Sequence, residues 1–262
     1  MSRVERAFAR AREERRAALV AYLCAGDPSL ERTRELVPLL FQAGADLVEL
    51  GLPFSDPIAD GPVIQAASFR ALQAGTTAAG VLDTVAALRA GGCDGPIALM
   101  SYLNPILAVG LDPFAARAAA AGVDALVLPD VPLEQAEQLE PAFGRHGVEL
   151  ALLAAPTTPA ERLARIGARA RGFLYFVSVA GVTGARRELP PELIGQLRAA
   201  KAASRVPVVV GFGIGRPEQV AELAPHADGV VVGSALVRAL EGGGPAALSA
   251  LVTSLAQATA RR

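Results

Sequence analysis

The chain has 262 residues, of which 52% are hydrophobic and 19% are charged, and its 25 basic and 26 acidic side chains leave a net charge of −1. This balance argues against an electrostatic nucleic-acid binder, and no apolar run reaches the roughly 18 residues of a membrane span. The length allows one or two domains, with a core that needs no disulfide or metal for stability. The two cysteines make no disulfide framework, and residues 1–16 lack an apolar secretion signal, so we expect a cytoplasmic protein.

Short apolar runs recur along the chain and predict parallel strands that are buried on both faces. We predict these strands at Leu19–Leu23, Leu47–Leu50, Ile97–Met100, Ala125–Leu128, Glu149–Leu152, Phe173–Phe176, Val208–Val210 and Gly229–Val232. Helical spacing alternates with them at Leu30–Phe41, Pro113–Ala121, Leu133–Phe143, Ala160–Ile166, Pro191–Ala203 and Pro217–Leu223. Ser2–Arg15 predicts a further helix before the first strand, and Gly242–Gly244 separates two short helical pieces near the C-terminus.

The alternation predicts an α/β fold, a single (β/α)8 TIM barrel over residues 1–262 with an extra N-terminal helix. The alternative is an open doubly wound sheet, which requires a glycine fingerprint after the first strand. Here that strand leads into residues 24–28, Cys-Ala-Gly-Asp-Pro, so we favour the barrel. In such a barrel the chemistry lies at the C-terminal ends of the strands.

Glu49 interrupts an apolar strand, and strand alternation places it on the opposite face from Val48 and Leu50. An inward Glu49 is desolvated, which raises its pKa and suits it to proton transfer near neutral pH. An outward Glu49 paired with an arginine is the alternative. The loop that follows holds three prolines, two glycines, Asp56 and Asp60. That composition is typical of an active-site cover, and turn capping is the alternative role for the two aspartates.

Glycines follow the last two predicted strands, in Gly211–Gly215 and in Gly233–Ser234, where a helix begins. Backbone amides at such positions bind anions, and phosphate often lies after strands seven and eight of these barrels. We therefore predict a phosphate site there, with ordinary turns as the alternative. Residues 179–187 hold two glycines and two arginines. They form either a loop that closes over an anionic substrate or an ordinary connection.

Aromatic residues gather at or just past the predicted strand ends: Tyr22, Tyr102, Tyr175 and Phe212. Each of them alone is more often a packing residue of the core. Together they indicate an apolar pocket wide enough for a flat ring.

Several motifs resemble those of the tryptophan synthase α subunit family. The longest runs from Glu49 to Pro57 and on through Ala59–Pro62. The others occur in the family's order, at Tyr102–Pro105, Leu128–Pro132, Gly181–Gly184, Gly211–Ile214 and Pro217–Val220. The resemblance covers nearly the whole chain. It implies a lyase of tryptophan biosynthesis, a single barrel that cleaves indole-3-glycerol phosphate to indole and glyceraldehyde 3-phosphate.

The resemblance also implies a role for each matching residue. Glu49 and Asp60 are the implied catalytic pair. Substrate contacts are implied for Tyr22, Met100, Val127, Leu153, Tyr175, Thr183 and Phe212, and phosphate contacts for Gly184, Gly213, Gly233 and Ser234. The implied partner is a pyridoxal-phosphate-dependent β subunit, facing Pro53, Asp56 and Pro57 in an α2β2 heterotetramer. No cofactor or metal is implied on this chain. Two positions depart from the pattern, because Tyr22 stands where many members have Phe and Val179 where some have Arg.

The residues themselves favour cleavage without a lysine imine or a histidine-bound zinc. Lys201 is the only lysine and lies in a predicted helix, and the two histidines, His146 and His226, lie near predicted helix ends. Indole can accept the electron pair itself once its carbon 3 is protonated. We hypothesise that Glu49 shuttles that proton and that Asp60 is the ionised partner of the indole N–H.

Three other functions remain open at this point. One is a stand-alone lyase that releases free indole, and another is a non-catalytic subunit that activates a pyridoxal-phosphate-dependent partner. The third is a different phosphate-sugar barrel, such as a histidine-pathway isomerase. The presence of both Glu49 and Asp60 argues against a non-catalytic subunit, and the Pro/Asp loop after the second strand disfavours the isomerase.

Overall fold

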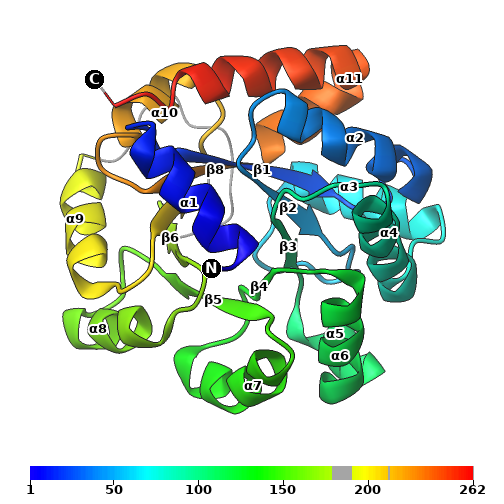
Figure 1. Cartoon of the computed structure of the whole chain (residues 1–262), viewed down its shortest axis with the longest axis horizontal. Helices are drawn as coiled ribbons and strands as arrows, with labels where there is room; N and C mark the ends of the chain where they lie inside the picture. The colour runs from blue at the N-terminus through cyan, green and yellow to red at the C-terminus, as the bar shows by residue number, and fades with distance from the viewer. Residues whose placement is uncertain (179–190, 212, 262) are drawn as a thin grey trace.

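The computed structural model describes residues 1–178, 191–211 and 213–261, and within these ranges eight parallel strands close into a barrel (Figure 1). Each strand pairs with the next in sequence, and β8 pairs with β1. The strands are β1 (Ala18–Cys24), β2 (Leu47–Gly51), β3 (Ile97–Met100), β4 (Ala125–Val127), β5 (Glu149–Ala154), β6 (Leu174–Val177), β7 (Val208–Gly211) and β8 (Gly229–Val232). The predicted TIM barrel is confirmed, and each strand lies within two residues of its predicted bounds.

Helices surround the barrel, and α1 lies across one end of it (Figure 1). The helices are α1 (Arg3–Glu13), α2 (Leu30–Gln42), α3 (Pro62–Gln73), α4 (Ala78–Ala90), α5 (Leu103–Val109), α6 (Leu111–Ala121), α7 (Leu133–Arg145), α8 (Ala160–Arg169), α9 (Leu193–Ala203), α10 (Pro217–Leu223) and α11 (Ser234–Gln257). The predicted N-terminal helix is therefore present. It begins at a capping box in which the Ser2 hydroxyl accepts from Glu5 N–H and the Glu5 carboxylate accepts from Ser2 N–H.

Three helices, α3, α4 and α5, were not among the predicted ones. Helix α3 begins at Pro62 with no side-chain cap, α4 is apolar on most of its surface, and α5 has only seven residues. Each thus lacks a side-chain cap, an amphipathic period or the length that makes a helix recognisable in sequence. The predicted break near the C-terminus lies at Gly244, whose φ of 66° is non-helical and divides α11.

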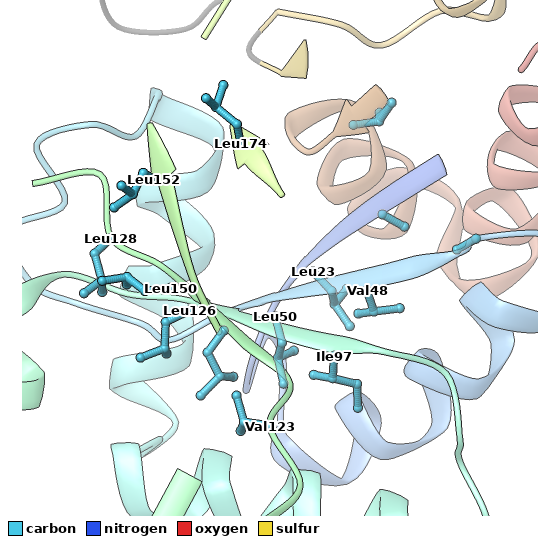
Figure 2. Close-up of a cluster of buried hydrophobic side chains, with 14 of the residues drawn as sticks. Leu23, Val48, Leu50, Ile97, Val123, Leu126, Leu128, Leu150, Leu152 and Leu174 are labelled. Atoms are coloured by element: carbon cyan, nitrogen blue, oxygen red, sulfur yellow. The ribbon is translucent and has the colours of Figure 1, made fainter. Parts of the chain in front are cut away.

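Strand alternation divides the apolar core into two layers. Outward side chains pack beneath the helices, and Figure 2 shows Leu23, Val48, Leu50 and Ile97 of this outer layer beside neighbouring strands. Inward side chains fill the barrel, where they are packed together with residues of α1. Phe8 of α1 lies 6.1 Å from Phe173, measured between ring centroids. Helix α1 therefore covers the N-terminal end of the barrel, and the chemistry is left to the other end.

An aspartate immediately precedes each of three even-numbered strands: Asp46 before β2, Asp124 before β4 and Asp228 before β8. Each carboxylate accepts a hydrogen bond from the first or second residue of the preceding strand, and each aspartate N–H donates to that residue's carbonyl oxygen. The carboxylate bonds are from Leu19 N (2.9 Å), Ile97 N (2.8 Å) and Val208 N (3.0 Å). These aspartate clamps fasten three strand pairs at the base of the barrel.

We expect Asp46→Asn to lower the free energy of unfolding by about 2–4 kcal/mol. The Asp46 side chain is fully buried and pairs with Arg10 and Arg16, each at 2.8 Å. A neutral side chain leaves Arg10 without its anion and Arg16 with only the exposed Glu14. The control is Asp83→Asn, which breaks an exposed pair with Arg117 and should cost less than about 1 kcal/mol. Urea denaturation measures both losses, and equal losses would contradict a clamp at Asp46.

No helix in the described ranges combines the length and the apolar character required to cross a membrane.

Candidate active site

A cavity opens at the C-terminal end of the barrel. Its walls come from the ends of β1, β2, β3, β6 and β8, from the segments after β2 and β7, and from the starts of α3 and α11. The lining residues are Tyr22, Glu49, Asp60, Ile64, Met100, Tyr175, Gly213, Ile214, Val231, Gly233 and Ser234. This is the end at which TIM-barrel enzymes carry out their chemistry.

Glu49 projects inward from the middle of β2. Its neighbours across the sheet are Tyr22 of β1 and Ala98 of β3. The side chain is 2% exposed, and its Oε1 atom has no hydrogen-bond partner among the described residues. Burial raises the pKa of Glu49 to about 8, and the nearby negative charge of Asp60 adds to the rise.

Asp60 reaches the cavity from the loop that follows β2. Its backbone is held on both sides, because Asp60 N–H donates to the carbonyl of Pro57 (3.0 Å) and its own carbonyl accepts from Gln65 Nε2 (2.9 Å). The residue is 5% exposed. Burial raises the pKa of Asp60 to about 6, against a smaller opposing effect of a hydrogen bond from Tyr102.

The two carboxyl groups therefore differ in charge over a common pH range. Between about pH 6 and 8, Glu49 is mostly protonated and Asp60 is mostly ionised. A pair of titratable groups whose environments separate their pKa values is suited to supply an acid and an anion together.

Two tyrosine rings in the cavity wall depend on glycines of the neighbouring strand. A Cβ at Gly51 would lie 2.2 Å from the Tyr22 hydroxyl, and one at Gly211 would lie 2.3 Å from the Tyr175 hydroxyl. Both tyrosines are nearly fully buried, at 3% and 6% exposed. Gly51 thus makes room for the hydroxyl that distinguishes Tyr22 from a phenylalanine.

The adjoining part of the wall, after β7 and β8, has the features of an anion site. Gly213 adopts a positive φ of 80°, which glycine allows without strain, and Gly233 and Ser234 form the start of α11. The first amides of a helix have no partner within the helix and carry the positive end of its dipole. This wall is therefore suited to a phosphate group.

The other sequence-predicted site residues lie in different places. Val127 and Leu153 belong to the barrel interior but do not line the cavity, and Pro53 is buried beneath the rim. Asp56 is exposed and Pro57 is half-buried. Three predicted residues lie outside the described part of the chain: Thr183, Gly184 and Phe212.

Three lining residues were not predicted: Ile64, Ile214 and Val231. Val231 follows from strand alternation in β8, and Ile214 belongs to the glycine motif that was noted for phosphate. Ile64 lies on α3, a helix that was not predicted, so no sequence signal pointed to it.

The lysine and the histidines lie away from the cavity. Lys201 pairs with Asp228 (2.8 Å) at the base of the barrel. His146 and His226 lie in segments that lead from a helix into β5 and β8, at the same end. In the described ranges, no group of three or more His, Cys, Asp and Glu side chains is arranged to hold a metal ion.

The fold and the cavity define a TIM-barrel enzyme with two carboxyl groups of unlike acidity beside a helix start that is suited to an anion. A family model described as tryptophan synthase alpha chain matches residues 8–260. The chain therefore belongs to the tryptophan synthase alpha chain family, as its motifs indicated.

Individual relatives agree with this assignment. The chain is 51% identical to the tryptophan synthase alpha chain of Geobacter sulfurreducens over 241 residues, which cover 92% of this chain and 91% of the relative. The alpha chain of Carboxydothermus hydrogenoformans is 50% identical over 241 residues, 92% of this chain and 90% of the relative. Among solved structures, a tryptophan synthase alpha chain of Legionella pneumophila superposes with a TM-score of 0.89 at 39% identity. The match covers 99% of this chain and 97% of that one. A Mycobacterium tuberculosis tryptophan synthase structure superposes with a TM-score of 0.91 at 40% identity. The match covers 100% of this chain and 99% of that one.

The protein is thus a lyase of tryptophan biosynthesis. It cleaves indole-3-glycerol phosphate, and this cleavage is the alpha half-reaction of tryptophan synthase.

Proposed function

We propose that Glu49 and Asp60 carry out this cleavage by acid–base chemistry, with no cofactor on this chain. The observation that supports the proposal is that both carboxyl groups line one cavity while their pKa values, about 8 and about 6, leave one protonated and the other anionic. The proposed roles need a protonated Glu49 and an ionised Asp60, and between about pH 6 and 8 each group is mostly in that state.

In the proposed reaction, protonated Glu49 donates to carbon 3 of the indole ring. The ring nitrogen then becomes cationic, and the Asp60 carboxylate accepts a hydrogen bond from its N–H. The bond between carbon 3 and the glycerol chain breaks, and its electron pair returns to the ring. The adjacent hydroxyl group loses its proton to the Glu49 carboxylate and becomes the aldehyde. One proton enters and one leaves, so Glu49 ends the cycle protonated.

The cavity walls support a placement for the substrate. The indole ring would lie among Tyr22, Met100 and Tyr175, and the phosphate would lie against Gly213 and the start of α11 at Gly233 and Ser234. The contacts proposed for Val127, Leu153, Thr183, Gly184 and Phe212 rest on the family resemblance.

We propose that the partner is a tryptophan synthase β subunit that carries pyridoxal phosphate, in an α2β2 assembly. A surface groove of about 970 Å³ lies between the loop after β2 and α3, and Asp56 and Pro57 both line it. Two large apolar side chains in it are exposed, Ile58 at 75% and Phe69 at 61%. An exposed apolar groove at the rim of the active site is suited to a partner that receives indole.

We expect Ile58→Asp to weaken binding of a purified β subunit at least tenfold, because a charge would be buried against an apolar surface. The matched control is Ala199→Asp on exposed α9, which lies on the opposite side of the barrel from α3 in Figure 1. Titration calorimetry measures both affinities.

Equal binding by both variants would remove the groove from the interface. The same preparations incubated with indole-3-glycerol phosphate, with and without the β subunit, separate a synthase subunit from a stand-alone lyase. Indole released at one rate in both cases would favour the stand-alone enzyme.

We further propose that the protein acts in the cytoplasm. Its two cysteines are free thiols, Cys24 buried and Cys93 half-buried, which is typical of a reducing compartment.

A further inference from the structure

Tyr102 lies beside the catalytic carboxylates but outside the cavity lining. It lies two residues after the end of β3 and occupies the N-cap position of α5. The residue is 3% exposed, and its ring packs against Phe54, with 5.4 Å between ring centroids. The ring thus rests under the loop that carries Asp60.

The Tyr102 hydroxyl joins two consecutive residues of that loop. Ala59 N–H donates to the hydroxyl oxygen at 3.0 Å, and the same hydroxyl lies close enough to the Asp60 carboxyl group to lower the pKa of that group. Burial raises the pKa of Tyr102, so its phenol stays neutral and keeps its proton. Because Ala59 supplies the donor of the first bond, the proton of the phenol is directed to Asp60.

This direction matters for the charge of Asp60. A donated hydrogen bond stabilises the carboxylate over the carboxylic acid and so opposes the effect of burial. The other titratable groups that interact with Asp60 are Tyr22, Cys24, Glu49 and Tyr175. None of these groups, all in the described part of the chain, is a cation. Tyr102 is thus the donor that favours the anionic form.

We propose that Tyr102 is a positioning residue for the cleavage reaction: its hydroxyl holds Ala59 and the Asp60 carboxylate together and keeps Asp60 the anion that faces the indole N–H. The proposal rests on the function proposed above for Asp60. The residue acts through Asp60 and does not touch the reacting atoms.

The test is the pH profile of kcat/KM for indole release by Tyr102→Phe, which keeps the ring and removes only the hydroxyl. The acid limb of the profile reports the ionisation of Asp60 in the free enzyme. We expect this limb to move to higher pH by about one pH unit, because a hydrogen bond to a charged group is lost. Activity should therefore fall about fivefold at pH 6 and recover toward the wild-type rate as the pH approaches 8.

The position of the limb does not depend on how much of the variant is folded. The matched control is Phe54→Leu, which loosens the ring contact but keeps the hydroxyl, and its acid limb should stay at the wild-type pH. A Tyr102→Phe profile that is lower at every pH with an unmoved limb would show a structural role alone and overturn the proposal.

A second variant separates this proposal from the one it rests on. In Asp60→Asn the acid limb should disappear from the residual activity. If it persists, the assignment of Asp60 itself is wrong. If it disappears while Tyr102→Phe leaves the wild-type limb unmoved, only the role of Tyr102 is wrong.

Discussion

Glu49→Gln is expected to reduce indole release by about 10²–10⁴-fold, the usual contribution of a proton-transfer group. The amide has nearly the same size as the buried acid but can neither protonate carbon 3 nor accept the hydroxyl proton. The phosphate wall is formed by other residues, so binding of inorganic phosphate or of an uncleavable indole phosphate should persist. Turnover within tenfold of wild type would rule out Glu49 as the proton shuttle.

A matched control tests the imine alternative in the same assay. Lys201 is the only lysine and is paired with Asp228 at the base of the barrel. Lys201→Ala should therefore keep its activity. A large loss in this variant, in properly folded protein, would favour an imine mechanism.

The same Glu49→Gln substitution has a second effect that does not involve turnover. The pKa of Glu49 is about 8 when folded and near 4.5 otherwise, so between these values the folded state holds a proton that the unfolded state has released. The free energy of unfolding therefore falls as the pH rises through this window. Glu49→Gln should remove this fall, on the order of a few kcal/mol between pH 5 and 8. Asp60 keeps its own contribution at lower pH in both proteins. Parallel stability curves would show that Glu49 is not held protonated.

Asp60→Asn is expected to reduce kcat by about 10²–10³-fold, as removal of a transition-state electrostatic partner usually does. The neutral amide cannot offset the charge on the ring nitrogen, and this interaction develops fully only in the transition state. KM should therefore change much less than kcat. Steady-state kinetics with indole-3-glycerol phosphate separate the two constants.

The control for that substitution is Asp112→Asn on α6, an exposed aspartate paired with Arg145. It should leave both constants unchanged. An Asp60→Asn variant that loses only affinity, with kcat intact, would place Asp60 in binding and remove it from the chemistry.

The barrel was predictable because buried parallel strands are short, apolar and separated by helical segments, and the closed sheet follows that order. The inward position of Glu49 followed from the period of two along β2. The wall of the cavity was harder to predict. Val127 lies at the end of β4 and packs in the barrel interior, but it is not among the residues that line the cavity. Tyr102 could not be selected in this way, since its proposed role comes from its interactions with Ala59 and Asp60, which lie 43 and 42 positions earlier in the chain.

The three aspartate clamps have a consequence for how the chain folds. Each joins groups that are only 27, 27 or 20 residues apart, so it can form once two successive strands and the one or two helices between them have emerged from the ribosome. Contacts this local carry a small loop-closure cost. We infer that the strand pairs β1–β2, β3–β4 and β7–β8 can set their register early. The remaining pair, β5–β6, begins with no such aspartate, and its Phe173 packs on Phe8, far away in sequence. That quarter of the barrel would then be the last to acquire its native alignment during synthesis.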